Sequence, residues 1–107
     1  MNWHTEKERK LIKKFGGIPL VKYGFDGKIN GKPVEVRCCR KDKRFRIQKN
    51  VHEVLLAKRG YYIFDAPGYS AVKMTAYKVD KLLTGKKWFK DRTYPHKFLR
   101  IGQVWNQ

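Results

Sequence analysis

The 107-residue sequence predicts one α/β domain in which helices and short strands follow one another. Asn30-Gly31 lies between two short runs of alternating polar and apolar residues, a pattern typical of a hairpin with a two-residue type I′ turn. Apolar residues recur at helical spacing before this hairpin and again after it. The segment Tyr61 to Asp65 begins with consecutive apolar residues, as expected for a buried strand.

The charge of the chain favours a polyanionic partner. The formal net charge is +17 and the pI is near 10.1, and such a charge attracts nucleic acid. A membrane partner is not expected, because the basic residues are spread along the chain and no apolar run is long enough to span a bilayer. Cys38 and Cys39 are adjacent, which does not suit a disulfide framework. A reducing, intracellular (cytoplasmic) location is therefore expected.

The first element is predicted to be a helix over residues 5–15, ended by Gly16-Gly17. Thr5 and Glu8 have the spacing of a capping box, in which Glu8 closes the start of the helix. Alternatively, Glu8 extends to the hairpin that follows and contributes a carboxylate there. The spacing by itself leaves both interpretations open and favours the first.

The hairpin is predicted to place two carboxylates and a cation on one face. A first strand is expected over residues 18–23, and the hairpin strands over residues 26–29 and 32–39. With Asn30-Gly31 as the turn, Asp26 faces Glu35 and Arg37 projects from the same side. Phe25, Val34, Val36 and Cys38 would form the opposite, core-facing side. Opposed like charges are destabilising unless something compensates, and a Mg²⁺ or Mn²⁺ ion held by Asp26 and Glu35 would do so.

A basic stretch follows the carboxylate face directly. We interpret residues 40–46 as a loop that is either solvated or in contact with phosphate groups. The candidate nucleic-acid-binding residues are Arg40, Lys41, Lys43, Arg44, Arg46 and Lys49.

The second half of the chain continues the alternation of helices and strands. The apolar spacing predicts a helix over residues 48–59, with Gln48 in its first turn and Gly60 at its end. His52 and Glu53 are adjacent, so they do not share a helix face, and both are expected at the surface. The remaining predicted elements are strands over 61–65 and 69–74 and a short helix over 75–83, capped by Thr75.

The last stretch, residues 86–107, interleaves basic and aromatic residues. This pattern suits backbone neutralisation combined with base stacking. Simple packing of the aromatic residues is the favoured alternative, with Phe98, Ile101 and Val104 expected in the core. We treat residues 5–74 as the core of a single domain spanning residues 1–107, and residues 75–107 as a basic, aromatic extension.

Several of these motifs resemble known nucleases. Asp26, followed at a short distance by Glu35-Val36-Arg37, resembles the D…(D/E)xK signature of the PD-(D/E)xK nuclease superfamily. Residues 8–12 (ERKLI) resemble the first-helix glutamate segment of archaeal Holliday-junction resolvases. Residues 47–55 and 59–63 are similar to the glutamine-led helix and strand of virus-type replication-repair nuclease domains. The resemblance covers about residues 5–74.

The resemblance implies a restriction-endonuclease-like core, an α+β mixed sheet flanked by helices in the order α-β-β-β-α-β. It also implies a metal-dependent, structure-selective DNA endonuclease that acts as a homodimer on branched DNA. In that assignment Asp26 and Glu35 bind the metal, Glu8 is an auxiliary carboxylate, and Gln48 positions the water or the backbone. Arg37 takes the place of the family's lysine and completes the catalytic set.

The arginine leaves alternatives open. Arginine stabilises negative charge, but its pKa is too high for it to act as a base, so Lys28, Lys43 or a metal-bound water would have to serve. A second hypothesis is a non-catalytic nucleic-acid-binding module that retains the nuclease fold. A third, an RNA-binding protein, depends on the charge alone.

Overall fold

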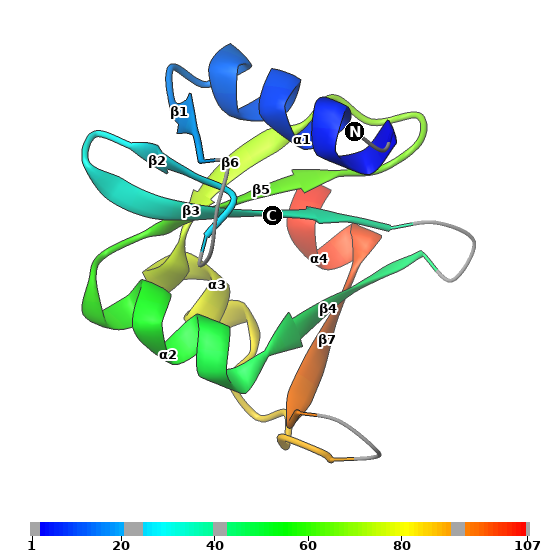
Figure 1. The fold of residues 1–107 in the computed structure, drawn as a ribbon. Coiled ribbons are helices and arrows are strands. Elements are labelled where there is room, and N and C mark those ends of the chain that lie inside the picture. Colours follow the sequence, from blue (N-terminus) through cyan, green and yellow to red (C-terminus); the bar gives the residue numbers. More distant parts are fainter. Residues whose placement is uncertain (1–2, 21–24, 40–42, 91–93, 107) are drawn as a thin grey trace.

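A five-stranded mixed sheet forms the centre of the molecule (Figure 1). The structure is a computed structural model that describes residues 3–20, 25–39, 43–90 and 94–106. The strand order is β1-β2-β3-β5-β6, in which β3 and β5 run parallel and the other pairs are antiparallel. The strands are β1 (Ile18–Pro19), β2 (Gly27–Ile29), β3 (Lys32–Cys38), β5 (Tyr61–Asp65) and β6 (Val72–Thr75). The predicted mixed sheet flanked by helices is confirmed.

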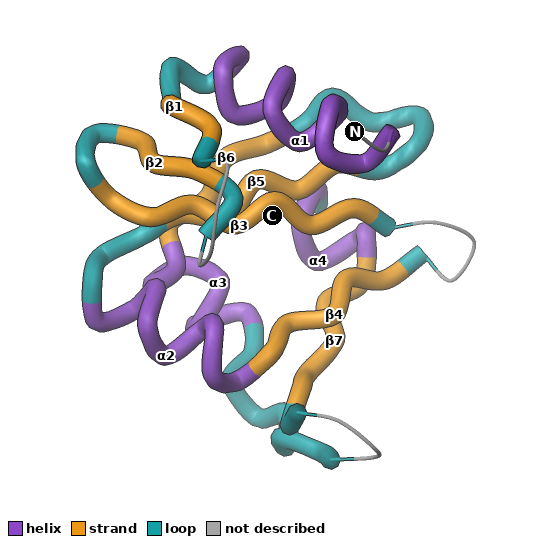
Figure 2. Tube along the Cα trace, in the orientation of Figure 1, coloured by secondary structure: helices purple, strands orange, loops and turns teal. Residues whose placement is uncertain are grey.

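Helices cover both faces of this sheet (Figures 1 and 2). α1 (Trp3–Lys14) lies on one face, and α2 (Lys49–Ala57) and α3 (Ala76–Leu82) lie on the other. Beneath α1, Ile12 packs in a small core with residues of β2, β3 and β5. A larger core on the opposite side includes Phe45, Tyr62 and Phe64. Since β5 is covered on both faces, its apolar residues are consecutive rather than alternating.

The β2–β3 hairpin has the predicted register. Gly27 pairs with Val34 and Ile29 with Lys32, so the turn is Asn30-Gly31. Both turn residues have positive φ, 53° and 73°, as a type I′ turn requires. The expected core side is correct for Val34, Val36 and Cys38, which pack on the α1 side. It is wrong for Phe25, which packs against the larger core on the other side.

The N-terminal elements differ from the prediction at their starts. α1 already includes Trp3, so the position of Thr5 lies inside the helix and is not the N-cap position. The capping-box interpretation of Glu8 is therefore wrong. The predicted first strand is shortened to Ile18–Pro19, and residues 21–24 lie outside the described part of the chain.

The basic stretch, which was expected to be a loop, contains a strand. β4 (Arg44–Gln48) pairs antiparallel with β7 (His96–Arg100) in a separate two-stranded sheet. Phe45 and Ile47 are fully buried, while Arg44 and Arg46 are exposed. The alternation of charged and apolar residues is a strand signal, which the high charge of the segment obscured. Of the predicted loop, residues 40–42 lie outside the described residues.

The C-terminal stretch is integrated into the fold through β7 and α4 (Ile101–Trp105). Val104 is buried in the larger core and Ile101 packs against it, as predicted. Phe98 is only partly covered, and the guanidinium of Arg44 lies 3.9 Å from its ring centroid. Packing thus accounts for two of the three apolar residues, and a cation–π contact accounts for the third.

The remaining elements follow the prediction closely. Thr75 caps α3, and its Oγ1 accepts a hydrogen bond of 3.1 Å from the Lys78 amide. β5 has the predicted bounds, whereas β6 begins later than expected and α2 is shorter at both ends. Among the described residues, no helix has the length and apolar character needed to cross a membrane.

Candidate functional site

Asp26 and Glu35 converge where β2 ends against β3. Asp26 immediately precedes β2, and the register of the hairpin places it across from Glu35. The Val36 amide donates a hydrogen bond of 2.8 Å to Asp26 Oδ2. This bond satisfies a β3 amide beyond the β2 ladder and holds the aspartate against the strand. The predicted opposition of the two carboxylates is thus explained by the turn and by one side-chain bond.

Glu8 joins these carboxylates from α1. In its protonated form the Glu8 side chain donates a hydrogen bond to Asp26. Burial raises the pKa of Glu8, and the charge of Asp26 raises it further. Of the two interpretations of Glu8, the structure supports the one that takes it to the hairpin, because α1 crosses the sheet edge at this point.

Arg37 supplies the positive charge beside the carboxylates. Its Nη2 atom lies 3.2 Å from Oε2 of Glu35, two positions earlier on the same strand face. The Arg37 Nε atom is buried and makes no hydrogen bond within the described residues. A buried donor without a partner is unfavourable, and an anionic oxygen from a ligand would satisfy it.

The carboxylates are poorly stabilised as anions in the absence of a metal ion. Burial raises the pKa of Glu35 to about 7, and the charge of Asp26 adds to this effect while Arg37 opposes it. Burial also raises the pKa of Asp26, opposed by the Val36 amide, by Arg37 and by the hydrogen bond from Glu8. Buried acids that lie beside one another favour either proton uptake or a bound cation.

The donor set suits a hard divalent cation. Mg²⁺ prefers oxygen ligands and is bound in proteins through one or two carboxylates, while water and phosphate oxygens complete its coordination. Asp26 and Glu35 would be those carboxylates. Among the residues that the structure describes, no group of three or more His, Cys, Asp or Glu side chains is arranged to hold a metal ion by itself. The two carboxylates of Asp26 and Glu35, with Glu8 alongside, have the oxygen donors that such a cation prefers.

The other predicted site residues lie on neighbouring elements. Gln48 is half-buried at the junction of β4 and α2, where it pairs with His96 of β7. Lys43 precedes β4, and Arg44 and Arg46 are exposed on that strand. Lys49 begins α2 and approaches Glu53 at 3.9 Å, and Arg40 and Lys41 lie outside the described residues. Whether these residues contact nucleic acid remains a prediction.

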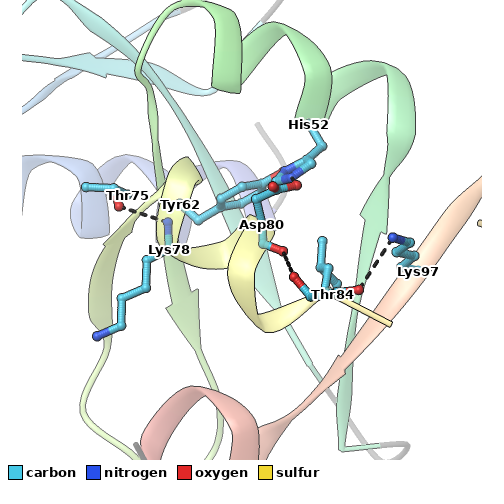
Figure 3. A network of polar contacts seen from close by, with 8 residues as sticks. His52, Tyr62, Thr75, Lys78, Asp80, Thr84 and Lys97 are labelled. Carbon is cyan, nitrogen blue, oxygen red and sulfur yellow. Dashed lines mark hydrogen bonds and ion pairs between the residues drawn. The ribbon is translucent and has the colours of Figure 1, made fainter. Parts of the chain in front are cut away.

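A polar network around the buried His52 was not anticipated (Figure 3). His52 contacts the Tyr62 hydroxyl at 2.9 Å through Nδ1 and Asp80 Oδ1 at 3.0 Å through Nε2. His52 is 1% exposed, so the expectation that it lies at the surface was wrong, whereas Glu53 is exposed as predicted. Tyr62 is the β5 partner of Glu35, so this network holds the strand that pairs with β3, on which the acid lies. The partners of His52 are far away in sequence, and no local pattern marks them.

The arrangement of helices and sheet is a restriction-endonuclease-like fold of the resolvase type. A solved structure with this fold is that of Hjc, a Holliday junction resolvase from the archaeal hyperthermophile Archaeoglobus fulgidus. The similarity covers 94% of this chain and 93% of that one, with a TM-score of 0.54 and 14% sequence identity. At this identity the likeness establishes the fold alone. No protein-family model and no curated protein sequence matches the chain.

Proposed function

We propose that this protein is a metal-dependent, structure-selective DNA endonuclease that hydrolyses phosphodiesters in branched DNA. The observation that carries the proposal is the convergence of Glu8, Asp26, Glu35 and Arg37 from α1, the residue before β2, and β3. The resolvase-type fold and the net charge of +17 support the same conclusion.

The proposed roles follow from the chemistry of each side chain. Asp26 and Glu35 would hold Mg²⁺ or Mn²⁺, and the chemistry such an ion supplies is a lower pKa for a nearby water and neutralised charge on the phosphate. Arg37 binds an oxygen of the scissile phosphate and stabilises the negative charge that develops there. Glu8 would lie beside the cation as an auxiliary carboxylate, next to Asp26, whose charge and hydrogen bond help to raise the pKa of Glu8. Gln48 positions the water or the backbone from the start of α2.

Arg37 marks where this chain departs from the D…(D/E)xK signature. Arginine remains protonated at all accessible pH values, so Arg37 binds charge and takes no proton. Its ion pair with Glu35 also neutralises one of the two metal-binding carboxylates. Under the proposal, Glu35 would be a ligand of the cation, and Arg37, whose buried Nε makes no hydrogen bond within the described residues, would bind the phosphate.

The proposed activity can be tested with a labelled four-way DNA junction and a linear duplex, each incubated with Mg²⁺ or Mn²⁺. We expect the junction to be cut and the duplex to be cut much less. Asp26→Asn and Glu35→Gln should each reduce the cleavage rate by at least about 100-fold, as loss of preorganised charge does in other sites. Equal cleavage by these variants and the parent protein would refute the proposal.

Glu53→Gln is the matched control for this experiment. Glu53 is an exposed glutamate on α2, with 61% of its side chain accessible, and its carboxylate lies 3.9 Å from Nζ of Lys49, itself exposed. The control should cut the junction at the parent rate. Asp26→Asn, Glu35→Gln and Glu53→Gln should first be shown to unfold cooperatively, so that a loss of cleavage reports on the site.

A second candidate function is binding of nucleic acid without cleavage. The observation that favours it is that Arg37 stands where the signature has a lysine and forms an ion pair with Glu35. Tight, salt-sensitive binding of the junction without cutting would support this candidate. In that case Arg37→Lys tests whether the fold retains a site that one lysine can activate.

The partners proposed for this site are branched DNA and a second copy of the chain. A homodimer would bring two sites to one junction, so that both strands are cut in a single complex. Junction preference over RNA duplex or loop substrates would exclude the RNA-binding hypothesis. A reducing, cytoplasmic location remains part of the proposal, and both described cysteines are free thiols.

A further inference from the structure

A basic groove lies between β4, β7 and the connection from α3 to β7. Its volume is about 730 Å³, and its cationic lining consists of Lys43, Arg44, Lys86, Lys87, Lys97 and Arg100. No acidic side chain is among the described residues of its lining. The carboxylates of the candidate endonuclease site lie on α1, before β2 and on β3, and none of these elements lines the groove.

The positive charge of the groove is crowded and held in place. Lys86 Nζ donates to the Phe98 carbonyl at 2.6 Å and to Gln103 Oε1 at 2.8 Å. Burial lowers the pKa of Lys86, and the charges of Arg100 and Lys97 lower it further. Lys97 lies 4.5 Å from the centre of the Trp88 ring and donates to the Leu83 carbonyl at 3.4 Å (Figure 3). Like charges confined in this way are relieved by an anion.

A second hollow continues the groove and adds an aromatic ring. It measures about 460 Å³, shares Lys43 and Arg100 with the basic groove, and is also lined by Pro67 and Tyr69. Tyr69 is 46% exposed, and Phe89 in the basic groove is 48% exposed. Each hollow therefore contains one half-exposed ring, and both hollows contain the same two cations.

Both rings pack against a second aromatic side chain. Tyr69 packs on Trp105 with ring centroids 4.7 Å apart, and Trp105 Nε1 donates to the Ser70 carbonyl at 2.9 Å. Phe89 is joined to His96 by two backbone hydrogen bonds and packs edge-on against the His96 ring at 4.1 Å. Rigid, exposed rings lose little entropy when a flat ligand stacks on them.

We propose that this track of two hollows binds single-stranded nucleic acid, with phosphates on the shared cations and bases stacked on Tyr69 and Phe89. Backbone charge alone would fit a duplex equally well, but stacking platforms need bases that are not already paired and stacked. Unpaired nucleotides occur at branch points and at frayed ends. The track goes beyond the proposed cleavage site and does not require that site to be catalytic.

The test compares single-stranded and duplex DNA in a Glu35→Gln background, so that cleavage cannot affect the result. A labelled oligothymidine of about 16 nucleotides and a blunt-ended duplex, without a hairpin loop and with the same total number of phosphates, are titrated with protein. We expect Tyr69→Leu and Phe89→Leu each to weaken single-strand binding by about 5- to 150-fold, the range that corresponds to stacking of one base on an aromatic ring. Duplex binding should change less than about 2-fold, since its phosphate contacts remain.

The control variants, Tyr77→Leu and Lys58→Gln, change residues outside the lining of the two hollows. Tyr77 is 65% exposed and lines a separate hollow near Lys32 and Gly60, so Tyr77→Leu should leave single-strand binding unchanged. Lys87→Gln should lower the slope of log affinity against log salt by about 0.7, while Lys58→Gln should not. The proposal would be overturned if both ring variants bound single-stranded DNA as tightly as the parent. It would also be overturned if they lost as much affinity for duplex as for single strand, or if Tyr77→Leu lost as much single-strand affinity as they do. Quenching of tryptophan emission at saturating oligothymidine, smaller in Tyr69→Leu than in the parent, provides a second readout, because Trp105 packs against Tyr69.

Discussion

At the scale of single residues, the charge of Glu35 opposes folding of the metal-free protein. Its pKa of about 7 lies above the value of 4.5 for an exposed glutamate, because burial disfavours the anion. A raised pKa means that the folded state holds the proton more tightly than the unfolded state does. Stability is therefore greatest below about pH 4.5 for this group, and it falls as the pH rises towards 7.

Replacing Glu35 by glutamine should remove that penalty. In EDTA at pH 8 we expect Glu35→Gln to raise the free energy of unfolding by about 1–3 kcal/mol, the order implied by a shift of this size. The gain should vanish near pH 4.5. Urea unfolding at several pH values measures the effect, and Glu53→Gln should show no such pH dependence. A Glu35→Gln protein that is less stable than the parent at pH 8 would contradict the burial argument.

The Tyr62 hydroxyl illustrates a residue whose role is to complete a hydrogen-bond network. In Tyr62→Phe the His52 Nδ1 atom loses its partner inside the larger core. An unsatisfied buried group costs about 1–3 kcal/mol, so we expect the free energy of unfolding to fall by that amount. Tyr77→Phe removes an exposed hydroxyl and should change stability by less than about 0.5 kcal/mol. Similar stabilities for the two variants would show that the network contributes little.

At the scale of elements, the join between α2 and β5 depends on a glycine. A Cβ atom at Gly60 would lie 2.5 Å from the Pro33 carbonyl oxygen and 2.7 Å from a Leu55 methyl group. The carbonyl belongs to β3 and cannot move without disturbing the sheet. The close approach of α2 to the hairpin thus requires a residue without a side chain.

Two alanine substitutions separate close packing from helix propensity. Gly60→Ala should lower the free energy of unfolding by about 1–3 kcal/mol, as overpacking does. Gly102 lies in α4, where the nearest atom to an added Cβ is 3.6 Å away, so Gly102→Ala should raise stability by about 0.5–1 kcal/mol. Thermal unfolding distinguishes the two. A Gly60→Ala protein as stable as the parent would mean that α2 and β3 can separate at little cost.

At the scale of the whole molecule, the charge predicts how nucleic-acid binding responds to salt. With +17 formal charges and a basic groove, the chain can neutralise several phosphates at once. For about 6–10 phosphate contacts we expect affinity for duplex DNA to fall by about 10³- to 10⁵-fold between 50 and 200 mM salt. Titrations of the Glu35→Gln protein in KCl measure the slope. An affinity that is insensitive to KCl would show that the charge has another purpose.

What the sequence determined by itself was local. The Asn30-Gly31 turn sets the hairpin register, and that register brings Asp26 opposite Glu35. Thr75 caps α3 three residues before its partner amide. These features could be predicted because the interacting groups are close in the chain, so that turn geometry and capping rules specify them without reference to the rest of the fold.

Only the tertiary structure decided the rest of the site. Glu8 reaches Asp26 because α1 packs over the sheet edge, and His52 is buried because β5 and α3 supply its partners. The β4–β7 pairing joins Arg44 to Arg100 across half the chain and creates the basic groove. Such contacts depend on the free energy of packing distant segments together, which local patterns do not encode.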